Sequence, residues 1–100
     1  MTIKDQINYV NKSLSVIKSK VKAVFGVNLN IDEINLSAPT KHNSFYYSYV
    51  IDAEQEVARV VDQLIDQLQR QNIIKNADRL EDWEDVKRFL DYVVDKLQKY

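Results

Sequence analysis

Apolar residues recur along this chain at alternating spacings of four and three, in three separate runs. The runs are Ile3, Ile7, Val10, Leu14, Ile17, Val21 and Val24; then Tyr46, Val50, Ala53, Val57, Val60 and Leu64, closing one residue late at Leu68; and then Trp83, Val86, Leu90, Val93, Leu97 and Tyr100. Residues spaced in this way lie on one face of an α-helix, so each run predicts an amphipathic helix that buries one side. Three such faces predict helices that pack on one another.

The first helix has clear signals at both ends. Thr2 can accept a hydrogen bond from an unpaired amide of the first turn, and Asp5 stands three residues later, as in a capping box. Gly26 occupies the position where a helix commonly ends in a left-handed conformation. We therefore expect a helix over about residues 3–25.

The third helix is expected from about residue 79 to the C-terminus. Asp78 and Glu81 form a second pattern typical of a capping box, and further acids follow in the first turns. Negative charge there is stabilised by the positive end of the helix dipole.

The segment 45–51 allows two interpretations. It is rich in aromatic and β-branched residues, which favours a strand paired with 27–31. However, Tyr46 and Val50 keep the phase of the run that continues to Leu68, which favours one continuous helix. The pattern loses its register after Leu68, so this helix should end between 69 and 74.

These elements predict a single, mainly α domain over residues 1–100. We expect an antiparallel three-helix bundle with a long irregular connection over 27–44, because a short link between the second and third helices favours antiparallel neighbours. The alternative is an α+β fold with a small β-hairpin from about 27–31 and 45–51.

Composition excludes several kinds of chemistry. Of the 100 residues, 45% are hydrophobic and 29% charged, which is typical of a globular domain. The absence of cysteine excludes disulfides, thiolate catalysis and Cys-ligated zinc, and a single glycine excludes a Gly-rich phosphate loop. The one histidine, His42, lies in a polar loop, where a solvated side chain is the ordinary interpretation. We predict no enzyme activity, no catalytic residue, no cofactor and no metal site.

The chain shows no signs of export or membrane insertion. Charged and polar residues interrupt the N-terminal pattern after Ile3, and no continuous apolar stretch is long enough to span a bilayer. We therefore expect a cytoplasmic protein without a membrane partner. Lys, Asn, Ile and Tyr make up 33 of the 100 residues, a bias typical of AT-rich coding DNA, which points to a small bacterial or mobile-element protein.

Aromatic residues that lie beside or outside the apolar runs, together with Val16, are the remaining signal. On helical geometry several of them fall beside or opposite the core-facing residues, where a large rigid side chain with a polar tip suits a protein interface. The predicted partner-binding residues are Tyr9, Val16, Tyr47, Phe89, Tyr92 and Tyr100. They predict a protein-interaction module that binds a protein partner or self-associates. If it self-associates, the expected homo-oligomer is a homodimer.

Charge asymmetry supports a second hypothesis. Residues 1–26 contain five lysines and one aspartate, whereas residues 52–100 contain twelve acids and eight bases. A nucleic-acid-associated protein would use Lys12, Lys18, Lys20 and Lys22. The acidic C-terminal half disfavours direct nucleic-acid binding and suggests instead a regulator or inhibitor that mimics nucleic acid.

Overall fold

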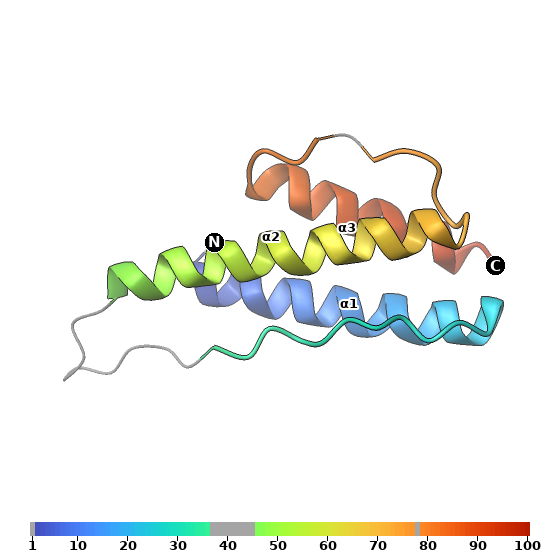
Figure 1. The fold of residues 1–100 in the computed structure, drawn as a ribbon, viewed down its shortest axis with the longest axis horizontal. Coiled ribbons are helices and arrows are strands. Elements are labelled where there is room, and N and C mark those ends of the chain that lie inside the picture. The colour runs from blue at the N-terminus through green and yellow to red at the C-terminus, as the bar shows by residue number, and fades with distance from the viewer. Residues whose placement is uncertain (1, 37–45, 78) are drawn as a thin grey trace.

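The computed structural model describes residues 2–36, 46–77 and 79–100, apart from the side chains of 46–48. Within these ranges it contains three helices and no strand: α1 (Ile3–Phe25), α2 (Tyr46–Arg70) and α3 (Trp83–Gln98) (Figure 1). Helix α1 packs against both α2 and α3. The expected mainly α fold is therefore confirmed, and the contacts fit a helical bundle.

The structure contradicts the alternative with a β-hairpin. Residues 46–51 belong to α2, and residues 27–36 form no regular secondary structure. Local strand propensity is outweighed because Ala53, Val57 and Leu64 extend one helical phase and are buried together. Helix α2 ends at Arg70, within the expected range.

The predicted ends of α1 are confirmed. Thr2 and Asp5 form a complete capping box, in which each side chain accepts a hydrogen bond from the other residue's backbone N–H. Gly26 has a φ of 69°, a left-handed conformation that glycine adopts at little cost, and its N–H donates to the Lys22 carbonyl.

The start of α3 differs from the prediction. The helix begins at Trp83 rather than at 79, and its N-cap is Asp82, whose carboxylate accepts from the Asp85 N–H at 3.0 Å. The expected cap, Asp78, lies outside the described residues. Two similar cap patterns follow one another here, and the later one begins the helix, directly before the first residue of the apolar run.

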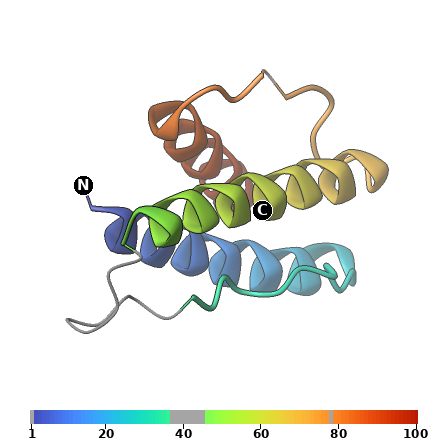
Figure 2. The same cartoon turned by 60° about the vertical axis from the view of Figure 1, so that its left-hand side comes forward.

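The expected antiparallel arrangement is not confirmed, because the contacts between α1 and α3 run in the same order along both helices. Tyr9 near the start of α1 meets Trp83 at the start of α3, and Lys20 near the end of α1 meets Tyr100. Figure 1 shows all three helices running from left to right, and Figure 2 shows the same directions after rotation. The reason for α3 is that the connection after α2 is longer than expected, and its described residues, 71–77 and 79–82, lead back beside the helices.

Residues 27–36 lie along α1 in an extended conformation and complete the core. Leu29, Ile31 and Ile34 are buried, and they join the apolar faces of the helices in one cluster. We call residues 27–36 the strap. The most completely buried large side chains are Leu14, Ile17, Ile31, Leu64, Leu68, Leu90 and Leu97.

Two side-chain amides hold the strap in place. Asn11 donates to the Ile34 carbonyl at 2.9 Å and accepts from the Ile34 N–H at 2.8 Å. Gln67 of α2 makes the same pair of bonds with Asn30, at 3.0 and 2.8 Å. Each amide thus forms the hydrogen bonds that a neighbouring β-strand would otherwise supply. It pairs with the N–H and the carbonyl of a strap residue that belongs to no β-ladder.

Candidate interaction surfaces

A groove runs between α1 and α3 on the surface of the bundle. Two adjoining cavities of about 420 and 470 Å³ form it, and they share Val16, Val94 and Gln98. We call this surface the α1–α3 groove. Its other lining residues are Tyr9, Lys12, Ser13, Ser15, Ser19, Lys20 and Ala23 from α1, and Asp91, Asp95 and Leu97 from α3.

Tyr9 lies at one end of the groove and mainly joins the two helices. Its ring packs edge-on against Trp83, with ring centroids 5.8 Å apart and an interplanar angle of 86°. Its hydroxyl donates to Asp91, and the Lys87 ammonium lies 5.6 Å from the ring centroid. The hydrogen bond to Asp91 raises the pKa of the Tyr9 phenol, and burial and the negative charge of Asp91 add to the shift.

Val16 is the apolar centre of the groove. Its exposed fraction of 39% is large for a valine in a helix that packs on two neighbours. The positions around it on α1 carry small side chains, Ser13, Ser19 and Ala23. Small side chains allow another helix to approach closely, because interaxial distance depends on the residues at the contact.

The charged residues of the groove are separated by helix. Lys12 and Lys20 stand on α1, while Asp91 and Asp95 stand on α3. Asp91 pairs with Lys87 at 3.7 Å and Asp95 with Lys99 at 3.5 Å, both along α3. Lys12 has no ion pair with any side chain in the described part of the chain. The groove therefore has one basic and one acidic edge.

A second groove lies between α2 and the start of α3 and has a cavity of about 470 Å³. Apolar residues of both helices line it, including Val61 and Trp83. Its charged lining residues are all acidic: Glu54, Asp62, Glu81 and Asp82. We call it the acid-rimmed groove.

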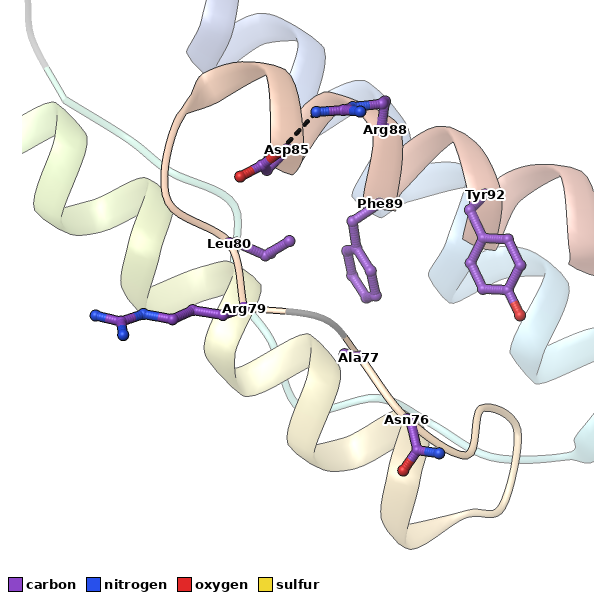
Figure 3. Close-up of a pocket in the computed structure, with 8 residues that line it drawn as sticks. All are labelled: Asn76, Ala77, Arg79, Leu80, Asp85, Arg88, Phe89 and Tyr92. Atoms are coloured by element: carbon purple, nitrogen blue, oxygen red, sulfur yellow. Dashed lines mark hydrogen bonds and ion pairs between the residues drawn. The ribbon is translucent and has the colours of Figure 1, made fainter.

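A third, smaller pocket of about 350 Å³ lies between α3 and four residues of the preceding connection, Asn76, Ala77, Arg79 and Leu80 (Figure 3). Phe89 and Leu80 point toward each other across it, whereas the Arg79 side chain extends away from them. The Arg88 guanidinium is engaged by Asp85 at 2.7 Å. The pocket thus has an apolar centre between Leu80 and Phe89, with its arginines turned elsewhere.

The structure divides the predicted partner-binding residues among separate places. Tyr9 and Val16 share the α1–α3 groove, and Phe89 and Tyr92 line the pocket of Figure 3. Tyr100 stacks edge-on against Phe25 at a centroid distance of 5.2 Å.

Their accessibility also differs. Tyr92 and Tyr100 are 52% and 60% exposed, but Phe89 is only 8% exposed and belongs to the core. Phe89 is covered because the connection before α3 folds over it, which the helical pattern alone could not show. The side chain of Tyr47 and all of His42 lie outside the described parts of the chain.

Sequence reasoning did not select Asp91, Asp95 and Val94 as interaction residues. The two aspartates are one helical turn apart on α3, and this spacing could have indicated that they share one face of the helix. Their position opposite the lysines of α1 depends on how the helices pack.

Neither a metal cluster nor a membrane-spanning helix is found in the part of the chain that the structure describes. No three His, Asp or Glu side chains there are placed to hold a metal ion. None of α1, α2 and α3 combines the length and apolar character needed to cross a bilayer. Comparison with protein-family models finds no match, and comparisons with curated proteins and solved structures find none either.

Proposed function

We propose that this chain is a non-enzymatic protein-interaction module that binds a protein partner through the α1–α3 groove. The observation that carries the proposal is the exposed Val16 at the centre of a groove with charged edges. Protein interfaces share this arrangement, with an apolar centre and a polar rim. Tyr9 supports the proposal by presenting part of an aromatic ring at one end of the groove.

Helix packing adds support for a helical occupant. The groove is bordered by two helices that run in the same direction, and its α1 wall carries serines and alanine around Val16. An amphipathic helix laid into such a groove would pack its apolar face on Val16 and Val94.

Site-specific photocrosslinking tests the proposal. A photoreactive amino acid at Ser19, exposed in the groove, should form a covalent adduct with a protein in the native cells. The same residue at Gln55, exposed on α2, serves as the matched control. Val16→Glu should abolish the Ser19 adduct because it places a charge at the apolar centre. Equal adduct yields from Ser19 and Gln55 would contradict the proposal.

The acid-rimmed groove supports a second candidate, a nucleic-acid mimic that occupies a basic protein. Its four carboxylates surround an apolar floor with no basic residue in the lining. A protein surface that binds phosphates would meet a similar density of negative charge.

A Lys/Leu amphipathic peptide is a suitable probe for this candidate. Binding should weaken steeply between about 50 and 200 mM salt, because salt screens the contacts between the lysines of the peptide and the carboxylates of the groove. Asp62→Lys should reduce binding about tenfold more than the control Asp52→Lys, which lies outside the groove. Binding that is insensitive to salt would exclude the candidate.

A further inference from the structure

The separation of charges in the α1–α3 groove restricts what can cover it. The best-matched partner presents negative charge above Lys12 and Lys20 and positive charge above Asp91 and Asp95, which form only exposed ion pairs with Lys87 and Lys99 in the described part of the chain. A nucleic-acid strand fails this requirement because its phosphates would meet the two carboxylates. A second copy of the chain carries both charges on one face.

A two-fold axis in the plane of the face has two limiting orientations, along the helices and across them. If the two-fold axis runs along the helices, α1 of one copy covers α3 of the other, so lysines face aspartates twice. If the axis lies across the helices in the plane of the face, α1 covers α1, and lysines face lysines. Only the first arrangement is electrostatically complementary, and a two-fold axis repeats each favourable contact.

We propose that the α1–α3 groove is covered by a second copy of this chain, in a dimer whose two-fold axis runs along the helices. This inference rests on the proposed function and names its partner. Lys12 of one protomer then lies over Asp95 of the partner subunit, and Val16 packs at the centre of the interface.

The heights of the charges along the bundle agree with this arrangement. A rotation about an axis along the helices leaves the height of each residue unchanged. Lys12 and Asp95 line the same cavity, whose lining extends over about two helical turns on each helix. The rotation therefore brings the two side chains into the same two-turn stretch of the interface.

The size of the face sets the expected strength of the dimer. Helix α3 has 16 residues and is about 24 Å long, and two adjacent helices are about 20 Å wide. The resulting footprint of roughly 500 Å² is below the ~800 Å² per partner of a standard interface. The dimer should therefore be reversible, with a dissociation constant in the micromolar range.

Paired charge reversals test the proposal by sedimentation velocity between about 10 and 500 µM protein. Lys12→Glu and Asp95→Lys should each weaken self-association about tenfold or more, because each creates two repulsive contacts per dimer. An equimolar mixture of the two variants should associate again. In the mixed dimer one contact has both charges reversed and the other keeps the native Lys12 and Asp95, so opposite charges meet in both contacts.

Two exposed charged residues outside the groove provide the controls. Lys22→Glu and Asp52→Lys reverse exposed charges outside the groove and should leave the association unchanged, while circular dichroism verifies that all variants are folded. A wild-type chain that stays monomeric at 500 µM overturns the proposal, as does a mixture that fails to associate.

The Ser19 crosslink separates this inference from the proposed function. An adduct with a second copy, together with rescue in the mixture, supports both. An adduct with a different protein and a monomeric wild type retains the proposed function and overturns the dimer. Absence of any adduct above the Gln55 control, with a monomeric wild type, overturns both.

Discussion

At the scale of a single residue, the Asn11 side chain forms hydrogen bonds that another backbone segment would normally form. Its amide both donates to and accepts from Ile34, so one side chain satisfies both backbone polar groups of a strap residue. The contact is partly buried, and Ile34 itself is 4% exposed. This amide therefore fixes the position at which the strap lies on α1.

Asn11→Ala should destabilise the folded chain by about 1–3 kcal/mol, because it leaves the Ile34 N–H and carbonyl without partners. Urea unfolding followed by circular dichroism measures the change. Asn8→Ala is the matched control, since Asn8 is exposed on the same helix. An equal effect of the two substitutions would show that the amide pair does not hold the strap.

Such a contact could not be predicted from the sequence. Asn11 reads as an ordinary polar residue at the edge of an amphipathic helix, and its partner lies 23 positions away on the backbone. Hydrophobic periodicity reports which face of a helix is buried. It does not report which polar side chain near that face pairs with a peptide group.

Tyr9 provides a titration signal for the contact between α1 and α3. Its hydrogen bond to Asp91 favours the protonated phenol, so the pKa of Tyr9 lies above the ordinary value near 10. Because the pKa is raised in the folded state, the bond contributes stability below pH ~10 and loses it as pH rises through the folded pKa.

Asp91→Ala should lower the pKa of Tyr9 toward its ordinary value. Trp83 reports the titration, because ionised Tyr9 beside it quenches its fluorescence, and Trp83 is the only tryptophan. Asp95→Ala, one turn further along α3, should leave the midpoint unchanged. An unchanged midpoint in Asp91→Ala would contradict the assigned hydrogen bond.

At the scale of elements, the three helices could be predicted because their apolar runs are long and strictly periodic. Helix α1 matches the prediction at both ends, since Thr2, Asp5 and Gly26 act locally. The start of α3 did not match, because Asp78 and Asp82 both begin a plausible cap four residues apart. Where α3 begins depends on its packing against α1 and α2, which a local pattern does not contain.

The Asp82 cap can be tested directly. Asp82→Ala should destabilise the chain by about 1 kcal/mol, because the Asp85 N–H loses its acceptor. Asp82→Ser retains a side-chain acceptor and should recover most of this loss in thermal or urea unfolding. Equal destabilisation by alanine and serine would show that the cap does not limit the stability of α3.

At the scale of the whole molecule, the direction of the helices determines which surfaces exist. An apolar run has no direction: the same residues are buried whether the neighbouring helix runs up or down. Direction depends on the connections, and here the strap and residues 71–77 and 79–82 lead back along the bundle. The parallel arrangement places Lys12 and Asp95 in the lining of one cavity, whereas an antiparallel α3 would have brought different residues to the groove.

Spin labels on α1 test this arrangement by paramagnetic relaxation. A nitroxide on Ala23→Cys should broaden amide signals of Leu97 and Gln98 and spare those of Trp83, because Ala23 lines the groove beside the end of α3. A label on Asn8→Cys should give the opposite pattern, since the neighbouring Tyr9 contacts Trp83. The chain has no native cysteine, so each label reports from one position.

The proposed dimer would transfer the same pattern between copies, because its axis preserves height along the helices. Spectra are therefore recorded at a concentration below dimer formation, with a mixture of labelled chain and isotope-enriched unlabelled chain as the control. Broadening within the chain that persists on dilution establishes the parallel packing of α1 and α3. If Ala23→Cys instead broadened the first turn of α3, the helices would be antiparallel, and the charge pairing on which the dimer depends would no longer exist.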